Sequence, residues 1–346
     1  MRKIILTLDS SQMGGIETHV LTLAAYLSDE GYDVEVWFIK QYQGNLLYQF
    51  LDEHKVSYRF CGSVKGYWQQ LWRHRHNIIL HTHGYKAGIV GRLFARSMKI
   101  PVLSTYHSGD VGTGKLRFYS WLDQLTAGLG ERIAVSQPIK EMLPKGTKMI
   151  PNFINVAQAK VKPNPNRLQP LRVAFVGRLS KEKGPDQFCK MAADWHSDKP
   201  VEFVVYGDGP ERTRLLEEFS DRVRFKGYVN MKKHWQDVDV LCISSRYEGL
   251  PYVALEAMAL GIPVVSFAVG GIGDLISEPS LGWLVEAGNI AKLKQALTQW
   301  YDLSDSDKTC LSQNVREKIR KQYSTAALVP SIEAIYRSYK KGECNE

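Results

Sequence analysis

Two glutamates in the segment RYEGLPYVALEAMALG are spaced so that they could bind hydroxyl groups: Glu248 and Glu256 are separated by seven residues. Residues 238–244 before them predict a buried strand, and an amphipathic helix is expected to begin near Tyr252. Glu248 would then lie in a loop at the carboxyl end of a strand, the edge at which open α/β sheets bind ligands. Glu256 would lie in the first turns of the helix, so both carboxylates could accept hydrogen bonds from a polyhydroxylated ligand.

The start of the same helix offers a second kind of contact. The backbone N–H groups of Gly249, Leu250 and Tyr252 are expected to point out of the helix start, where the helix dipole favours an anion or a hydroxyl oxygen. The alternative interpretation is structural: Glu248 caps the helix, and Glu256 is a solvated helix residue.

A basic loop lies earlier in the chain. Residues 171–176 predict a strand, Gly177 allows a tight turn, and a helix is expected to begin near Pro185. Arg178 and Lys183 both lie in this loop and would reach over the end of the strand. A fork-shaped guanidinium and a point-charge ammonium on one loop are suited to holding a diphosphate. The alternative is that both cations are only solvated loop residues.

The elements that must position these residues fall on either side of a proline-rich segment. With 346 residues and 44% hydrophobic composition, the chain is long enough for two domains with separate cores. Segment 157–170 contains three prolines and almost no large apolar residue, so it predicts an extended linker. We expect an N-terminal domain at 1–160, a second domain at 161–330, and a C-terminal helix or tail at 331–346 that packs back on the first domain.

Short apolar runs alternate with helical patterns in both halves. Such alternation is typical of two parallel, doubly wound α/β sheets, with a nucleotide-sized ligand in the cleft between them. The predicted strands are 3–8, 33–39, 78–81, 102–106 and 132–135 in the first half, and 171–176, 201–206, 223–225, 238–243 and 263–267 in the second.

Cysteine usage and hydropathy indicate a cytoplasmic chain. The five cysteines are widely spaced, odd in number and without a C-x-x-C pair, so we expect a reducing compartment and no zinc. The N-terminal segment MRKIILTLDSS predicts a first strand and not a signal peptide. The longest uncharged stretch, 257–273, contains Pro263 and four glycines and is not expected to span a membrane.

A basic and aromatic window distinguishes the first half. The net charge is +9, and residues 55–99 contain nine Lys or Arg and no Asp or Glu. Tyr67, Trp68 and Trp72 lie among these cations, a mixture that suits the headgroup region of an anionic bilayer. The alternatives are an ordinary solvated helix with core aromatics, and nucleic acid, which no accompanying motif supports. We expect peripheral docking of this window on the inner face of the cell membrane, and no nucleic-acid partner.

No metal site is expected. The H-R-H and H-T-H spacings place their histidines on one face only in a strand, and no acid lies nearby to complete a site. Two D-x-D patterns are interpreted as incidental, because one leads into a buried strand and the other lies in a polar segment between helices. The residues concerned are His74, His76, His81, His83, Asp237, Asp239, Asp305 and Asp307.

Taken together and in this order, these motifs resemble the retaining glycosyltransferases of the GT-B fold, family 4, which use nucleotide-activated sugars. The basic loop followed by the glutamate pair is the strongest signal. The resemblance implies two Rossmann-like domains facing a central cleft, and a metal-independent enzyme with no cofactor besides its sugar donor. It covers most of the chain through KIILTLDSSQMGGIETHV, STYHSGD, IAVS, IPNFIN, VGRLSKEKG, VYGDGPER, YEGLPYVALEAM and GIPVVSFAVGGIGDLI.

The resemblance also implies roles for individual residues. Glu256 corresponds to the residue that hydrogen-bonds the nucleotide ribose, and Glu248 to the one that binds hydroxyls of the donor sugar. Arg178 and Lys183 correspond to the diphosphate contacts, and His107 to the favoured catalytic histidine near the reacting sugar. The other donor-binding positions are Gly15, Gly249, Leu250, Pro251 and Tyr252.

The expected reaction moves a hexose or N-acetylhexosamine, with retention of configuration, from a nucleotide-diphosphate sugar to a glycan or lipid-linked acceptor. UDP is the expected nucleotide, and cell-envelope polysaccharide or lipopolysaccharide synthesis the expected process. No protein nucleophile is needed, because the enzyme stabilises the leaving diphosphate and an oxocarbenium-like sugar. The chain departs from the usual family sequence at Phe153, Asn155 and Asp274. Asp274 stands where a glutamate is common, and its shorter side chain bears on which donor sugar is bound.

Two other classes of protein remain as alternatives. A nicotinamide-dependent dehydrogenase would need G-x-G-x-x-G after a strand, and GDGPER at 207–212 supplies only two of those glycines. A non-catalytic protein that binds carbohydrate or a membrane surface would have no reason to combine the basic loop with the glutamate pair.

Overall fold

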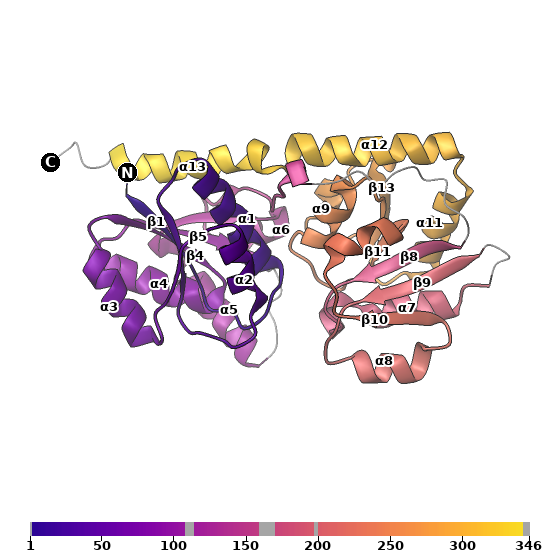
Figure 1. Ribbon diagram of the computed structural model, residues 1–346, viewed down its shortest axis with the longest axis horizontal. Coiled ribbons are helices and arrows are strands. Elements are labelled where there is room, and N and C mark those ends of the chain that lie inside the picture. Colours follow the sequence, from indigo (N-terminus) through magenta and orange to yellow (C-terminus); the bar gives the residue numbers. More distant parts are fainter. Residues whose placement is uncertain (1, 108–113, 159–169, 197–199, 342–346) are drawn as a thin grey trace. The chain divides into compact units, whose positions relative to one another are not determined.

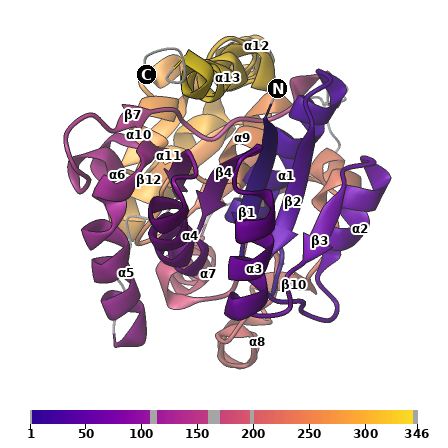
Figure 2. The same ribbon diagram turned by 90° about the vertical axis from the view of Figure 1, so that its left-hand side faces the viewer.

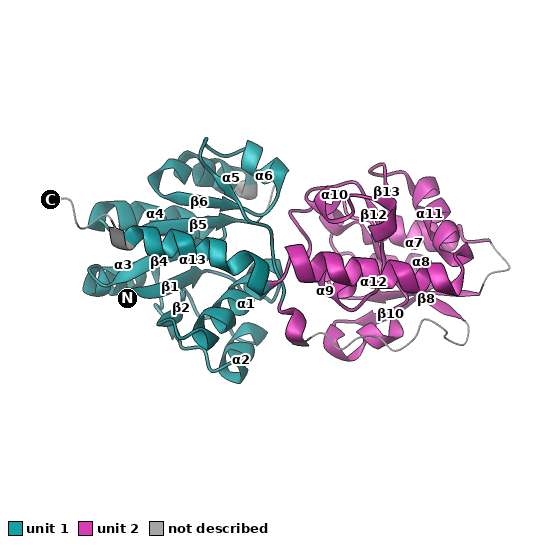
Figure 3. Cartoon of the chain, turned by 90° about the horizontal axis from the view of Figure 1, so that it is seen from above, with its two compact units in different colours: residues 1–154, 325–346 teal, residues 155–324 magenta. Residues whose placement is uncertain are grey.

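The computed structural model describes residues 2–107, 114–158, 170–196 and 200–341, and the chain forms two compact units (Figure 3). Unit 1 comprises residues 1–154 and 325–346, and unit 2 comprises residues 155–324. Unit 1 is therefore discontinuous in sequence, because its last helix follows the whole of unit 2. The boundary expected between residues 160 and 161, most of the expected linker, and the tail 342–346 lie outside the described residues.

Unit 1 is built on a seven-stranded sheet in the order β3-β2-β1-β4-β5-β6-β7, and every pair is parallel (Figure 1). Its strands are β1 (Lys3–Leu8), β2 (Val34–Phe38), β3 (Tyr58–Phe60), β4 (Ile78–His83), β5 (Val102–Tyr106), β6 (Glu131–Ala134) and β7 (Lys148–Met149). Its helices are α1 (Gly15–Asp29), α2 (Leu46–Glu53), α3 (Val64–His74), α4 (Tyr85–Met98), α5 (Lys115–Leu125), the 3-10 turn η1 (Ala127–Leu129), α6 (Gln137–Glu141) and α13 (Thr325–Lys341).

Side chains of β1 alternate between two cores. Ile4, Leu6 and Leu8 pack in a cluster with residues of α1 and α13, whereas Ile5 packs with residues of α3 and α4. Because successive strand residues point to opposite faces, the continuous apolar run KIILTL requires helices on both sides of the sheet. The local sequence of β1 thus accounts for the doubly wound arrangement of unit 1.

Unit 2 is built on a six-stranded parallel sheet in the order β10-β9-β8-β11-β12-β13. Its strands are β8 (Leu171–Val176), β9 (Val201–Tyr206), β10 (Val223–Gly227), β11 (Val240–Ile243), β12 (Val264–Phe267) and β13 (Gly282–Val285). Its helices are α7 (Pro185–Ala193), α8 (Arg212–Phe219), α9 (Tyr252–Ala259), α10 (Ile272–Leu275), α11 (Ile290–Asp302) and α12 (Asp305–Gln322). Its 3-10 turns are η2 (Val156–Gln158), η3 (Lys181–Lys183), η4 (Met231–Lys233), η5 (Trp235–Asp237) and η6 (Pro279–Leu281).

The strand order of unit 2 reverses between β8 and β11, which are neighbours in the sheet although they are distant in sequence. Val173 lies beside Val240, and Ala174 beside Leu241. Ligands of open α/β sheets bind at the carboxyl ends of the strands at such a reversal point. The pairing of β8 with β11 therefore brings the basic loop and the glutamate loop to the same place.

The two parallel, doubly wound sheets confirm the fold class expected from the sequence. The predicted strands agree with β1, β2, β4, β5, β6 and β8 to β12, with differences of a few residues at their ends. Three strands were not predicted: β3, β7 and β13 are short and lie at sheet edges, where the apolar pattern is weak. None of the described helices is both long and apolar enough to cross a bilayer.

Candidate functional site

The loop after β8 is held against the end of β11 by a glycine. Gly184 has a positive φ of 62°, and a Cβ atom at this position would lie 2.0 Å from the carbonyl oxygen of Ser244. Only glycine allows this close approach. The hydroxyl of Ser244 donates a hydrogen bond to the carbonyl oxygen of Gly184 at 2.8 Å. The contact fixes Lys183, the preceding residue, beside the loop that carries Glu248.

Lys183 and Glu248 form an ion pair. The Lys183 ammonium donates to both carboxylate oxygens of Glu248, at 2.9 and 2.8 Å, and the Ser245 hydroxyl donates to Oε1 at 2.7 Å. The Glu248 side chain is only 6% exposed, whereas that of Lys183 is 34% exposed. From the sequence the two side chains have separate expected roles, and their pairing is not predicted. The pair orients the carboxylate, and a phosphate that reaches Lys183 would compete with Glu248 for the ammonium.

Arg178 lies at the start of the same loop, and its side chain is exposed. Among the described residues, no ion pair holds its guanidinium. The loop between β8 and α7 therefore carries one exposed cation and one cation paired to a buried carboxylate. This arrangement leaves both positive groups on the side of the sheet edge at which a ligand would bind.

The glutamate loop leads into α9, which begins at Tyr252 as the sequence predicts. Gly270 has a positive φ of 56°, and a Cβ atom there would lie 2.1 Å from the carbonyl oxygen of Glu248. The N–H of Gly271 donates to the carbonyl oxygen of Gly249 at 2.5 Å. The glycine pair after β12 therefore supports the glutamate loop from behind, a role that the sequence analysis does not identify. The two remaining predicted positions of this loop are the buried residues Leu250 and Pro251.

Glu256 lies on α9 and is partly buried. Burial raises the pKa of its carboxyl group to about 7, although the charge of Lys232 and a hydrogen bond with Trp235 act in the opposite direction. These two residues come from η4 and η5, which precede β11. A carboxyl group with this pKa can change its protonation state near neutral pH, and in its charged form it would accept hydrogen bonds from vicinal hydroxyls.

The structure places Gly15 and His107 in unit 1 and the other predicted site residues in unit 2. Gly15 is the exposed first residue of α1, and Gly14 before it has an extended backbone. His107 directly follows β5 and is partly buried. Each unit thus carries its predicted residues at a helix start or just beyond a strand end, the positions at which this kind of sheet binds ligands.

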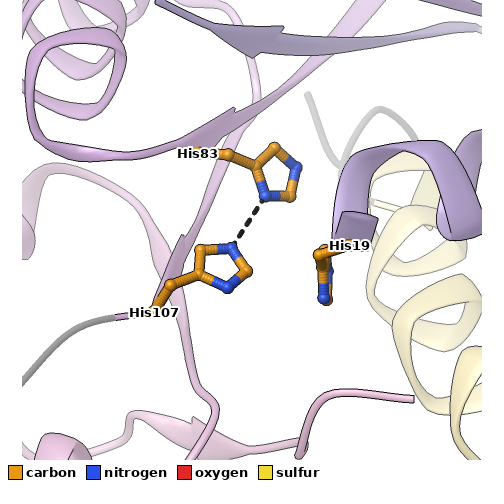
Figure 4. A group of neighbouring side chains, drawn as sticks. All are labelled: His19, His83 and His107. Carbon is orange, nitrogen blue, oxygen red and sulfur yellow. Dashed lines mark hydrogen bonds between the residues drawn. The ribbon is translucent and has the colours of Figure 1, made fainter. Parts of the chain in front are cut away.

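His107 belongs to a cluster with two buried histidines that is not predicted from the sequence (Figure 4). His83, the last residue of β4, lies with its Nδ1 atom 3.2 Å from Nε2 of His107. His19, from α1, packs its ring edge-on against that of His107 with 4.6 Å between ring centroids. The sequence indicates only that His83 and His107 each lie just beyond a predicted strand, and the adjacency of β4 and β5 that brings them together is seen in the structure.

The imidazoles of this cluster are held in the neutral form. Burial lowers the pKa of His107 and of His83 well below the usual value, and neighbouring histidines lower both further. Burial lowers the pKa of His19 to about 4, against a hydrogen bond with Asn152 that acts in the opposite direction. Neutral imidazoles keep one lone pair each and can accept a hydrogen bond or bind a cation.

The D-x-D pairs have structural partners. Asp239 accepts a hydrogen bond from the backbone N–H of Arg172 at 2.9 Å, and Asp237 pairs with the Arg172 side chain at 3.3 Å. Asp305 and Asp307 lie in the first turn of α12, where acidic residues complement the helix dipole. These contacts agree with their interpretation as incidental patterns.

Family models match both halves of the chain. A model described as Glycosyltransferase Family 4 matches residues 13–158, and one described as Glycosyl transferases group 1 matches residues 170–302. The second match contains the basic loop and both glutamates, and the first contains the histidine cluster.

Relatives and solved structures also indicate a glycosyltransferase. The chain is 27% identical over 290 residues to the UDP-Gal:alpha-D-GlcNAc-diphosphoundecaprenol alpha-1,3-galactosyltransferase of Escherichia coli, which covers 75% of this chain and 74% of that protein. The fold of this chain is similar to that of HepE of Anabaena in complex with UDP. The TM-score is 0.81 and the identity 18%, with coverage of 97% of this chain and 100% of the other. It is also similar to the lipopolysaccharide outer core galactosyltransferase WaaB, with a TM-score of 0.72, 19% identity, and coverage of 98% and 100%. From the site geometry and these matches, the chain belongs to the glycosyltransferases of the GT-B fold, with a family 4 domain followed by a group 1 domain.

Proposed function

We propose that this glycosyltransferase moves a hexose or N-acetylhexosamine from a UDP-sugar to a glycan or lipid-linked acceptor of the cell envelope, with retention of configuration. The observation that carries the proposal is the convergence of the basic loop and the glutamate loop at the carboxyl ends of β8 and β11. Lys183 and Glu248 are in contact there, Arg178 lies in the same basic loop, and Glu256 follows on α9. This set matches the groups of a nucleotide-diphosphate sugar: phosphates, ribose hydroxyls and sugar hydroxyls.

In the proposed reaction, the bond between the sugar and the diphosphate breaks largely before the acceptor attacks from the same face. Arg178 and Lys183 stabilise the negative charge that develops on the leaving diphosphate. Glu248 holds hydroxyls of the donor sugar, and Glu256 holds the ribose. His107, a neutral imidazole, orients a hydroxyl of the donor by hydrogen bonding. Alignment of donor and acceptor supplies the rest of the rate enhancement.

The names of related proteins support the choice of donor and acceptor. The Escherichia coli relative is named for UDP-Gal and for an acceptor linked to diphosphoundecaprenol. The Anabaena structures contain UDP or UDP-glucose, and the WaaB structure is that of a lipopolysaccharide galactosyltransferase. A polyprenyl-linked or lipopolysaccharide acceptor would require the enzyme to work at a membrane surface.

The first test concerns the nucleotide. Calorimetry should show UDP binding that is unchanged by EDTA, because Arg178 and Lys183 supply the positive charge that a metal ion would otherwise provide. ADP, GDP and NAD serve as competitors in the same titration, and a panel of UDP-sugars follows. Loss of UDP binding on chelation would contradict a metal-free site, and stabilisation by NAD alone would favour a dehydrogenase.

An exposed aromatic surface on unit 1 supports membrane docking. Trp68 and Trp72 of α3 are 39% and 48% exposed, and their rings stack with 5.7 Å between centroids. The Arg75 guanidinium lies over the Trp72 ring at 4.1 Å. Aromatic rings beside cations are typical of the headgroup region of a bilayer. Tyr67, which the sequence analysis placed with these tryptophans, is instead fully buried in the core between α3, α4 and the sheet.

Helix α5, outside the basic window, carries further exposed apolar side chains. Phe118 and Trp121 are 57% and 55% exposed and stacked, and Leu125 is 65% exposed. Helix α4 contacts both α3 and α5, so the three helices form one side of unit 1 (Figure 2). We call the exposed residues Trp68, Trp72, Phe118, Trp121 and Leu125 the aromatic face. Large exposed apolar side chains that gather on one side of a protein are typical of a surface that contacts a membrane or another protein.

The second test is co-sedimentation with vesicles. We expect binding to vesicles that contain phosphatidylglycerol at low salt and weaker binding at high salt, since each cation near an anionic surface contributes about 1 kcal/mol. Trp121→Ser in the aromatic face should weaken binding at both salt concentrations, whereas Tyr228→Ser, an equally exposed aromatic residue of unit 2, is the matched control. Binding to neutral vesicles that equals binding to anionic ones would contradict electrostatic docking and favour a soluble acceptor.

A further inference from the structure

The histidine cluster of unit 1 contains three imidazoles from three different elements: His19 from α1, His83 from the end of β4, and His107 from the segment after β5 (Figure 4). We propose that these three side chains form a binding site for a divalent transition-metal ion such as Zn²⁺ or Co²⁺, and that a bound ion takes His107 out of sugar transfer. The second part rests on the role proposed above for His107. The first part does not depend on any enzymatic activity.

The distances fit a metal ion. His83 Nδ1 and His107 Nε2 are 3.2 Å apart in a hydrogen bond, which a bound ion would replace. Two nitrogen ligands of a tetrahedral zinc ion, each about 2.0–2.1 Å from the metal, are about 3.3 Å apart. One ring nitrogen from each of the three histidines lies within 4.8 Å of the others. An ion held by all three imidazoles would draw the most distant pair together by up to about 1.5 Å.

The hydrogen bond of His19 prepares it as a ligand. Its Nδ1 atom lies 3.1 Å from the side-chain oxygen of Asn152. Because an amide oxygen can only accept, Nδ1 carries the proton, and Nε2 therefore keeps its lone pair. Metal-binding histidines usually have this arrangement, with the second ring nitrogen bonded to an oxygen.

The neighbouring His81 supports the cluster without belonging to it. Its two ring nitrogens are engaged by the Tyr336 hydroxyl at 2.6 Å and by Thr105 Oγ1 at 2.7 Å. Its ring packs against that of His83, with 4.2 Å between centroids. The site would therefore have three imidazole ligands and an open fourth position, which suits zinc or cobalt and not magnesium or calcium. His107 is only partly buried, so an ion can enter from its side.

A cobalt titration tests the site directly. The full chain, without a histidine tag and freed of EDTA, is titrated with Co²⁺ while the visible absorption of tetrahedral cobalt is recorded. We expect an intense band that saturates at one equivalent and disappears on addition of Zn²⁺. His19→Ala should weaken cobalt binding on the order of 100-fold or more, because loss of an outer contact alone costs 10–100-fold. Asn152→Ala, which removes a hydrogen-bond partner of the cluster but none of the three proposed ligands, should have the smaller effect.

The matched control is the double variant His74→Ala/His76→Ala, which removes another pair of closely spaced histidines in unit 1. It should bind cobalt like the wild type. Circular dichroism checks that each variant is folded, and His83→Asn is a second ligand variant in case His19→Ala unfolds. No tetrahedral band in the wild type, or a band that survives in His19→Ala and is lost in the control, would overturn the site.

The blocking effect is tested with the same proteins once a sugar donor is known. Zn²⁺ at one equivalent should stop transfer, and EDTA should restore it fully. UDP affinity measured on the zinc-bound protein should be nearly unchanged, because the charged groups proposed to hold UDP, Arg178, Lys183 and Glu256, lie in unit 2. A saturable cobalt band without any loss of transfer would overturn the link to His107. If no nucleotide sugar is a substrate, the proposed function fails while the cobalt band still decides the metal site.

Discussion

Replacement of Lys183 by alanine is expected to lower the rate of sugar transfer by about 10²–10³-fold, the usual cost of losing one group that stabilises developing charge. Two effects act together. The leaving diphosphate loses an ammonium, and the Glu248 carboxylate, only 6% exposed, loses its ion-pair partner and repels the phosphate. The measurement is kcat with saturating UDP-sugar. Lys181→Ala, an exposed lysine of the same turn, is the control and should be nearly silent.

A double-mutant cycle separates these two effects. Glu248→Ala alone should leave UDP affinity unchanged or raise it, because the freed ammonium of Lys183 becomes fully available to phosphate, while transfer falls. Adding Lys183→Ala to that background should then weaken UDP binding. If the double variant binds UDP as tightly as Glu248→Ala, Lys183 serves only to hold the carboxylate, and the proposed diphosphate contact is wrong.

Replacement of Glu256 should impair UDP binding, whereas replacement of Glu248 should impair transfer. Glu256→Ala is expected to weaken UDP binding by about 1–3 kcal/mol, through loss of a charge-assisted hydrogen bond to the ribose. Because the charged carboxylate is the better acceptor and its pKa is about 7, UDP affinity should fall as the pH is lowered from 8 to 6. Glu256→Gln should lose this part of the pH dependence. The ionisation of UDP itself is common to both proteins, so their difference reports the glutamate.

The raised pKa of Glu256 also predicts how folding stability changes with pH. A carboxyl group whose pKa is higher in the folded chain binds more protons there, so folding stability falls as pH rises from about 4.5 to about 7. Glu256→Gln should therefore raise the melting temperature at pH 8 and leave it almost unchanged at pH 4.5. The gain in the free energy of unfolding at pH 8 is at most about 3 kcal/mol. Equal UDP affinity losses in the variants of Glu248 and Glu256 would contradict the separate roles assigned to them.

The sequence predicts the architecture well because buried parallel strands are continuous apolar runs, as in residues 3–8 and 171–176. It also predicts which loops carry chemistry, since the carboxyl ends of strands at a reversal point are binding edges. The short edge strand β7, with two residues, gives no such run. The buried position of Tyr67 could have been predicted: Trp68 and Trp72 are four residues apart on one helix face, whereas Tyr67 and Leu71 form the inner face.

Contacts between distant residues could not be predicted in this way. The pairing of Lys183 with Glu248 depends on the close approach of two loops. Gly184 makes this approach possible, because a Cβ atom at its position would collide with the backbone of Ser244. The histidine cluster needs a helix residue, His19, to meet residues from two strand ends. Neither arrangement produces a recognisable spacing of residues along the sequence. Short motifs relate each histidine only to its neighbours in the sequence.

The placement of α13 has a consequence for how the chain acquires its structure. Val329, Ile332 and Tyr336 are fully buried in a core of unit 1, although they follow all of unit 2 in the sequence. During synthesis, domains generally fold in the order in which they emerge from the ribosome. Here residues 155–324 can complete their unit first, while the earlier residues still lack a wall of their core. The nascent N-terminal half must therefore wait, with apolar surface uncovered, until the last helix emerges.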